Sequence, residues 1–195
     1  MTLYVARHAQ TLANEHGLVL GSGDSPLTAT GREICAQLAA RLAPAGPGVV
    51  CTSPLGRAVA TAALFAAAFG WPVLTLDGLA ELSCGGWEGR PRDTVMPPGA
   101  ALRSGWTDTP PGGESCEAAE ARVRDAAARL AALAGGHVLV VGHAAVHQVL
   151  LGVLLSLPPA AALTIRHPHD VAYLVHEDEV SWVAADGACG RGFLT

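Results

Sequence analysis

Arg7 and His8 stand directly after a short apolar run, Leu3 to Ala6, with no turn signal between them. The run is long enough to form a buried strand. An arginine and a histidine fill a core poorly, but they are well suited to binding an anion and attacking it. If the sheet is open and parallel, ligands lie beyond the carboxyl ends of its strands. The pair therefore predicts, at the carboxyl end of this strand, a site that binds an anion and reacts with it.

Three further aliphatic runs each place a polar residue near their carboxyl ends. The runs and their polar residues are Val49 to Thr52 with Arg57, Val73 to Leu76 with Glu81, and Val138 to Val141 with His143. Helical patterns separate the runs, so we expect parallel strands whose ends share one edge of a sheet. That arrangement would gather Arg7, His8, Arg57, Glu81 and His143 around one cleft.

Two arginines and two histidines in one cleft form a site for an oxyanion. Phosphate is the most natural ligand, because the guanidinium fork matches its geometry. Glu81 is the one carboxylate among the five residues and is the evident proton donor. The five side chains therefore predict binding of a phosphate group and chemistry on it.

Helical patterns supply the elements between the runs. Residues 12–26 read as a loop, and Thr30 with Glu33 is a capping-box signature for the helix that follows. That helix carries Ile34, Leu38 and Leu42 on one apolar stripe. Further helices are expected over residues 56–69, 115–134 and 145–155, the second of them ended by the glycines at 135 and 136.

The C-terminal part has a different pattern, without the alternation of apolar runs and helices. Residues 170–176 and 180–185 read as an antiparallel pair, and residues 186–195 are expected to fray. Residues 83–114 look irregular, and a loop of that length usually serves as a lid or a binding rim. We therefore expect an α/β three-layer sandwich with a mostly parallel central sheet flanked by helices, and antiparallel edge strands near the C-terminus. A chain of 195 residues is most simply one domain over 1–195.

Composition narrows the classes of function. The net charge of −5 argues against a nucleic-acid surface. No apolar run is suited to crossing a membrane, and no basic segment followed by an apolar one opens the chain, so we expect a cytoplasmic protein. All twelve basic residues are arginine, so arginine is informative by its placement and not by its abundance. The five cysteines show no CxxC spacing, which disfavours both a disulfide framework and a zinc site.

Two groups of histidines offer a metal-binding alternative. His143 and His147 are four residues apart, a spacing that can ligate zinc on a helix. Gly142 and the strand before it argue against a helix already running at His143, so His147 is interpreted as structural. His167-Pro168-His169-Asp170 is interpreted as a polar loop before the last strands. Neither a metal nor another cofactor is expected.

Several segments, taken in order, resemble the histidine phosphatase superfamily, which includes phosphoglycerate mutases and many small-molecule phosphatases. Arg7-His8-Ala9-Gln10-Thr11 resembles its R-H-G-x-T/S opening, with Asn14 at the place of a phosphate-contacting asparagine. The other matching segments are Gly21 to Gly31, Ser53 to Ala62, Glu81 to Gly89, Gly112 to Ser115 and Val141 to His143. Any one piece is weak, but six pieces in register cover nearly the whole chain.

The resemblance implies a phosphatase mechanism without a metal. His8 would attack phosphorus and become a phosphohistidine, and Glu81 would protonate the leaving oxygen and later activate water. The residues implied to hold the phosphate or substrate are Arg7, Thr11, Asn14, Gly21, Arg57 and His143. The substrate would be a small phosphomonoester, and a homodimer is compatible with the sequence, which does not specify an oligomeric state.

Three departures from the family pattern bear on activity and specificity. Ala9 and Ala144 stand where the family usually has glycine, and alanine would be strained there if either backbone needed positive φ. Cys84 replaces an aromatic residue common just beyond the acid, which should reshape the leaving-group side.

Two alternative functions stay open. The lysine and extra arginines with which mutases hold a carboxylate have no clear counterpart, so we favour a phosphatase over a mutase. A non-catalytic binder of a phosphorylated ligand is the remaining alternative. Candidate substrates are a sugar phosphate, a nucleoside-like phosphate such as ribazole phosphate, and a secondary-metabolite phosphate.

Overall fold

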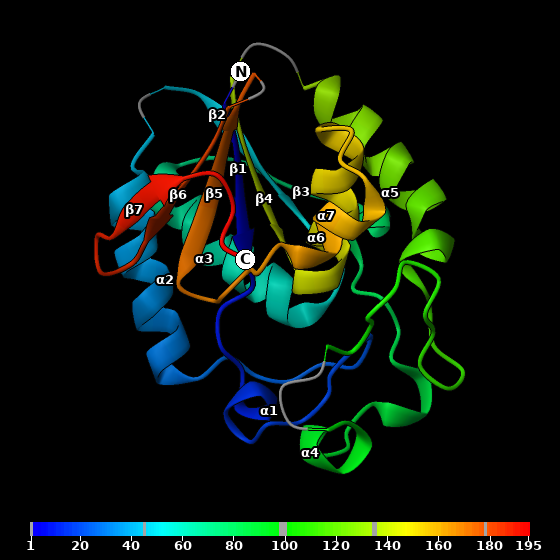
Figure 1. The fold of residues 1–195 in the computed structure, drawn as a ribbon. Helices are drawn as coiled ribbons and strands as arrows, with labels where there is room; N and C mark the ends of the chain where they lie inside the picture. The colour runs from blue at the N-terminus through cyan, green and yellow to red at the C-terminus, as the bar shows by residue number, and fades with distance from the viewer. Residues whose placement is uncertain (1, 45, 98–100, 134–135, 178) are drawn as a thin grey trace.

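The fold is taken from a computed structural model that describes residues 2–44, 46–97, 101–133, 136–177 and 179–195. Seven strands form one sheet in the order β3-β2-β4-β1-β5-β6-β7 (Figure 1). Their bounds are β1 Thr2–Arg7, β2 Gly48–Thr52, β3 Val73–Thr75, β4 His137–Gly142, β5 Val171–His176, β6 Glu179–Ala184 and β7 Cys189–Arg191. The α-helices are α1 Leu12–Glu15, α2 Ala29–Leu42, α3 Gly56–Phe69, α4 Arg92–Val95, α5 Cys116–Ala131, α6 Ala144–Leu154 and α7 Pro159–Thr164.

The first four strands are parallel to one another, and β5 and β6 are antiparallel, as the sequence predicts; β7 adds a third antiparallel strand that was not predicted. β4 lies between β1 and β2 and pairs in parallel with both. Arg7 of β1 pairs with Gly142 of β4, and Thr52 of β2 pairs with Val141 of β4. The carboxyl ends of the three strands therefore lie side by side at one edge of the sheet. Residues that follow them in sequence are thereby brought to a common edge.

Helices cover both faces of the sheet, which makes the three layers expected from the sequence. Strand β1 shows why, since its buried side chains alternate between two separate cores. Leu3 and Val5 pack with α5 and α6 on one face, whereas Tyr4 and Ala6 pack with α2 and α3 on the other. Figure 1 shows α5, α6 and α7 on one side of the sheet and α2 and α3 on the other.

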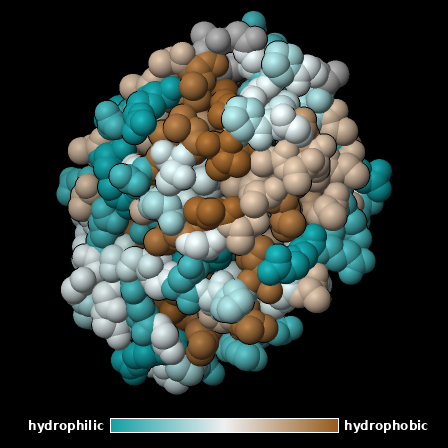
Figure 2. Space-filling view, turned by 180° about the vertical axis from the view of Figure 1, so that it is seen from behind, coloured by the Kyte–Doolittle hydropathy of each residue, from teal (hydrophilic) through white to brown (hydrophobic). Residues whose placement is uncertain are grey.

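Some apolar residues remain at the surface. Seen from behind, apolar residues form a broken band between hydrophilic margins (Figure 2). Large apolar side chains that remain exposed include Leu12, Val59 and Val73. Within the described part of the chain, every helix is too short or too polar to span a bilayer.

The expected N-terminus of helix α2 was wrong by two residues. Thr28, and not Thr30, is the N-cap residue, and its Oγ1 accepts the N–H of Gly31 at 2.9 Å. A tertiary contact decides this, because the backbone N–H of Thr28 donates to the carbonyl of Gln10 at 2.9 Å. The helix start is therefore fixed by the loop after β1.

Other boundaries also need correction. The expected fraying after Asp186 was wrong, because Cys189–Arg191 pairs with β6 as strand β7. A short helix, α1, lies in the expected loop 12–26, where Thr11 and Asn14 cap it reciprocally. Helix α7 was not expected. Helix α5 ends at Ala131, and one of the two glycines expected to end it, at position 135, lies outside the described residues.

Candidate active site

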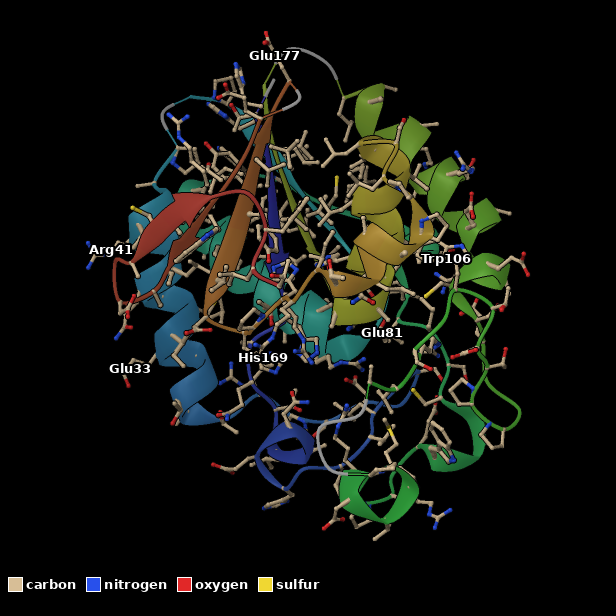
Figure 3. All side chains as sticks on the ribbon, viewed as in Figure 1. Glu33, Arg41, Glu81, Trp106, His169 and Glu177 are labelled. Carbon is tan, nitrogen blue, oxygen red and sulfur yellow. The ribbon has the colours of Figure 1, made fainter. Side chains whose placement is uncertain are left out.

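A cleft of about 900 Å³ lies at the carboxyl ends of the parallel strands. Residues at the end of β1 and at the start of α6 line it, together with Arg57 of α3 and parts of the segment 83–114. Its lining includes Arg7, His8, Asn14, Gly21, Arg57, Glu81, Cys84, Arg92, Arg103, Ala144, Gln148, Arg166, His167 and His169. Figure 3 shows Glu81 and His169 at this end of the sheet, approaching from different elements.

His8 is held as a neutral imidazole by its backbone and ring contacts. Its backbone N–H donates to the carbonyl of Gly142 at 2.8 Å, and its Nδ1 lies 2.8 Å from the carbonyl oxygen of Ala9. A carbonyl can only accept, so Nδ1 carries the proton and the lone pair is on Nε2. Burial, and then the charge of Arg7, lowers the pKa of His8 well below its ordinary value. The imidazole is therefore neutral near pH 7, with its proton on Nδ1 and a lone pair available on Nε2.

His143 lies beside His8, but it is not among the residues that line the cleft, where it was expected from the sequence. The centroids of the two rings are 5.1 Å apart. His143 is fully buried, and its Nε2 lies 2.7 Å from the hydroxyl of Ser53. Burial, followed by the charges of Arg57 and Arg7, lowers its pKa well below the ordinary value. Its Nδ1 is buried without a hydrogen-bond partner.

Arg7 and Arg57 bring two guanidinium groups to the cleft. Arg7 donates from Nη1 to the carbonyl of His167 at 3.2 Å, and Arg57 donates from Nη2 to the carbonyl of Gly21 at 2.9 Å. The Nε atoms of both arginines are buried without a partner. Burial lowers the pKa of Arg7 to about 10, so the group stays charged at neutral pH. Buried donors that lack acceptors in two neighbouring guanidinium groups indicate an oxyanion site.

Glu81 is held at the N-terminus of helix α6. Its Oε1 accepts the N–H groups of Leu82 and Val146, both at 3.0 Å, and its Oε2 accepts the N–H of Ala145 at 3.3 Å. The free N–H groups and the dipole at a helix N-terminus favour an acidic side chain at this position. The carboxyl group is thereby fixed in the wall of the cleft that His8 lines.

The family model that matches this chain is that of the histidine phosphatase superfamily, branch 1, over residues 3–185. The chain belongs to this superfamily. A Yersinia enterocolitica relative named "Probable phosphoglycerate mutase GpmB" is 32% identical over 95% of this chain and 89% of its own length.

Solved structures of the superfamily are also similar over most of their length. The alpha-ribazole phosphatase from Shigella flexneri has a TM-score of 0.77 at 29% identity, covering 92% of this chain and 93% of that one. A mycobacterial glucosyl-3-phosphoglycerate phosphatase in complex with VO3 has a TM-score of 0.81 at 26% identity, covering 98% and 97%.

Asn14, Thr11 and Gly21, also predicted from the superfamily pattern, occupy different positions. Asn14 lines the cleft. Thr11 is fully buried and is not among the lining residues; its Oγ1 donates to Oδ1 of Asn14 at 2.9 Å. Gly21 has a φ of +50°, and a Cβ there would lie 2.3 Å from Oε1 of Glu88. Thr11 thus positions Asn14, whereas Gly21 contributes its carbonyl to Arg57.

The departures from the superfamily pattern cause no backbone strain. Neither Ala9 nor Ala144 has positive φ. Ala9 packs in the core, and Ala144 is the first residue of α6 and lines the cleft. Cys84 is buried at the cleft wall, and burial raises the pKa of its thiol.

The cleft also contains residues that sequence reasoning missed. Arg92, Arg103 and Arg166 add positive charge to its wall, although no such arginines were expected from the family comparison. Arg103 is anchored by donation to the carbonyls of Glu114 and Ser83 at 2.8 and 2.7 Å. His169, from the segment interpreted as a polar loop, also lines the cleft. Histidines spaced closely beside a predicted strand were the available signal for it.

The histidines considered as metal ligands have other partners. His147 lies with its Nδ1 2.9 Å from Nδ1 of His167, while His143 contacts Ser53. His147 is fully buried, in keeping with the structural role predicted for it. Across the described ranges, no group of three or more His, Cys, Asp or Glu side chains is placed to share a metal ion.

Proposed function

We propose that this protein hydrolyses a small-molecule phosphomonoester, without a metal, through a phosphohistidine on His8. The observation that carries the proposal is the pairing of a neutral His8, whose free lone pair is on Nε2, with unpartnered guanidinium donors in the same cleft. The donors would hold the phosphoryl oxygens while the imidazole attacks the phosphorus atom.

In the first step the Nε2 lone pair of His8 forms a bond to phosphorus and the bond from phosphorus to the ester oxygen breaks. The leaving alkoxide takes a proton from the carboxyl group of Glu81 and departs as an alcohol. Arg7, Arg57 and Nδ1 of His143 neutralise the charge on the phosphoryl oxygens, a role that Mg²⁺ has in other phosphoryl-transfer enzymes.

In the second step water attacks the phosphorus of the phosphohistidine. Glu81, now a carboxylate, accepts a proton from the water as the bond between phosphorus and Nε2 breaks. Inorganic phosphate leaves and both His8 and Glu81 return to their starting states. The reaction therefore needs no oxidant, reductant or cofactor.

The charge of the cleft supports substrates with negative charge beyond the phosphate group. Among the described residues that line the cleft, five are arginine and one, Glu81, is a carboxylate. A phosphate dianion would leave net positive charge in the cleft of a chain whose own net charge is −5. We therefore expect a phosphomonoester that carries a second anionic group to be hydrolysed in preference to a neutral one.

Phosphoglycerate-mutase-type transfer is the alternative, and the name of the Yersinia relative favours it. The two structural neighbours, both named as phosphatases, favour hydrolysis. The two reactions differ in the fate of the phosphohistidine, which passes to water in a phosphatase and to a second substrate hydroxyl in a mutase. We also expect a single cytoplasmic domain that can act as a homodimer.

A panel of phosphomonoesters tests the proposal. Phosphate release should be measured for sugar phosphates, nucleoside-like phosphates and phosphorylated hydroxy acids, with the wild type beside His8→Ala. Release by the wild type alone supports hydrolysis at this site. Transfer between substrate positions without release would support the mutase, and ligand binding without either reaction would support the non-catalytic binder.

A further inference from the structure

We propose that His169 is a positioning residue of the active site, which fixes the nucleophile His8 through a hydrogen bond to its backbone carbonyl. The inference rests on the proposed function, because it assigns a role in the reaction of His8. No motif used to recognise the superfamily in this chain includes His169.

The contact between the two histidines is close and specific. Nδ1 of His169 lies 2.7 Å from the carbonyl oxygen of His8, and the two ring centroids are 5.0 Å apart with an interplanar angle of 62°. The fold makes this contact, because β5 begins at Val171 and pairs antiparallel with β1. The segment just before β5 is therefore returned to the carboxyl end of β1, where His8 lies.

The peptide group between His8 and Ala9 is held at both of its polar atoms. His169 donates to its carbonyl oxygen, and its N–H donates to Oγ1 of Thr61 at 3.0 Å. Thr61 in turn donates to the carbonyl of Arg57 at 2.7 Å. Rotation of this peptide would move the carbonyl of Ala9, which accepts the Nδ1 proton of the His8 ring. Fixing the peptide therefore fixes both the direction and the tautomer of the nucleophile.

The same segment holds the neighbouring arginine. The carbonyl of His167 accepts Nη1 of Arg7 at 3.2 Å. The ring of His167 is itself held, through Nδ1 to His147 at 2.9 Å and through Nε2 to the carbonyl of Val171 at 3.2 Å. Two residues of one short segment thus contact both members of the Arg7-His8 pair, one through a carbonyl and one through an imidazole.

The protonation of His169 argues that it acts through His8 and not on phosphate. A carbonyl only accepts, so Nδ1 of His169 is the donor and Nε2 carries the lone pair in the neutral ring. Burial, and then the charge of Arg7, lowers the pKa of His169 to about 3, so the ring is neutral near pH 7. A neutral Nε2 cannot donate to a phosphoryl oxygen. The donor that His169 offers is the one already directed at His8.

Amide substitutions separate the two nitrogens. The side-chain N–H of Asn can replace the Nδ1 donor, whereas Gln places its amide near Nε2. We expect His169→Gln and His169→Ala to lower the pre-steady-state rate of His8 phosphorylation about 10- to 100-fold with little change in KM, because small misplacements of a nucleophile have effects of this order. His169→Asn should stay within about threefold of the wild type, because it keeps the hydrogen bond to the carbonyl of His8.

A second readout does not depend on activity. In ¹⁵N-histidine NMR, the Nδ1 proton signal of His8 should keep its shift and slow exchange in His169→Asn, and should shift or exchange faster in the Gln and Ala variants. An unchanged signal in all three variants would overturn the proposal, as would a Gln variant that is active beside an inactive Asn variant. If the wild type forms no phosphohistidine, the proposed function fails, while the NMR result still decides the positioning role.

Discussion

The hydroxyl oxygen of Ser53 lies 2.7 Å from Nε2 of His143 and also accepts the backbone N–H of Leu55 at 3.3 Å. A hydroxyl has one proton and two lone pairs, so the oxygen can accept from Leu55 and still direct its own proton at Nε2 of His143. The neutral His143 ring then carries its proton on Nδ1, the atom that is buried without a partner. We infer that Ser53 prepares His143 as a neutral hydrogen-bond donor beside His8.

Ser53→Ala should remove this control of the tautomer. We expect kcat/KM to fall about tenfold and vanadate to inhibit less strongly, since one hydrogen bond contributes about 0.5–1.5 kcal/mol. The measurement is steady-state kinetics with vanadate inhibition, with Ser181→Ala in strand β6 as a matched control outside the cleft lining. Equal behaviour of both variants would show that Ser53 does not set the donor.

Glu81→Gln should affect substrates in proportion to the basicity of their leaving group. An alkyl alkoxide needs a proton in order to leave, whereas p-nitrophenolate is stable as an anion. We expect a loss of about 10²–10⁴ in the phosphorylation rate with an alkyl phosphomonoester, and a much smaller loss with p-nitrophenyl phosphate. Pre-steady-state bursts are the right measurement, because Glu81 also acts in the second step. Equal losses on both substrates would mean that the proton comes from another group.

Activity should survive prolonged chelation. In the proposed mechanism arginines supply positive charge and His143 supplies a donor to the phosphoryl group, so EDTA followed by gel filtration should leave kcat unchanged. Vanadate should inhibit, because it adopts the five-coordinate geometry of the transition state, and the mycobacterial neighbour is seen with VO3. Loss of activity that Mg²⁺ or Zn²⁺ restores would instead revive the histidine-ligand interpretation.

The stability of the fold should fall as the pH is lowered from neutrality. Burial lowers the pKa of both His167 and His169 to about 3, whereas histidine in an unfolded chain titrates near 6.5. Between these values the unfolded chain binds more protons than the folded one, so acid favours unfolding. Each of the two histidines should remove roughly 2 kcal/mol of stability between pH 7 and pH 5.

Urea titrations in phosphate-free buffer at several pH values measure this loss. His169→Asn removes one of the two histidines and should reduce the slope of unfolding free energy against pH by up to about 1.4 kcal/mol per unit. A wild-type unfolding free energy that is flat between pH 7 and pH 5 would contradict the neutral, buried state of these rings.

Much of the fold and the centre of the site follow from the sequence, for a physical reason. Short aliphatic runs alternating with helical patterns require parallel strands, and parallel strands bring their carboxyl ends together. That rule alone places Arg7, His8, Arg57 and His143 near one another without any knowledge of contacts. Glu81 follows a longer connection, yet it reaches the same cleft because its carboxyl group caps α6.

What escaped prediction depends on contacts between distant parts of the chain. His169 is 161 residues from His8, and the antiparallel pairing of β5 with β1 brings them together. Thr28 and Thr30 are both plausible caps locally, and only the contact of Thr28 with Gln10 decides between them. Arg92, Arg103 and Arg166 could not be singled out from the sequence, because every basic residue in the chain is arginine.

The chemical stability of the phosphoenzyme tests the central claim most directly. The enzyme should be mixed with a ³²P-labelled phosphomonoester, quenched in denaturant within the burst phase, and divided between acid and alkali. A phosphoramidate on histidine is hydrolysed by acid and survives alkali, so label should be lost in acid, persist in base and be absent from His8→Ala. Label that survives hot acid, or that persists in the His8→Ala enzyme, would contradict a phosphohistidine at His8.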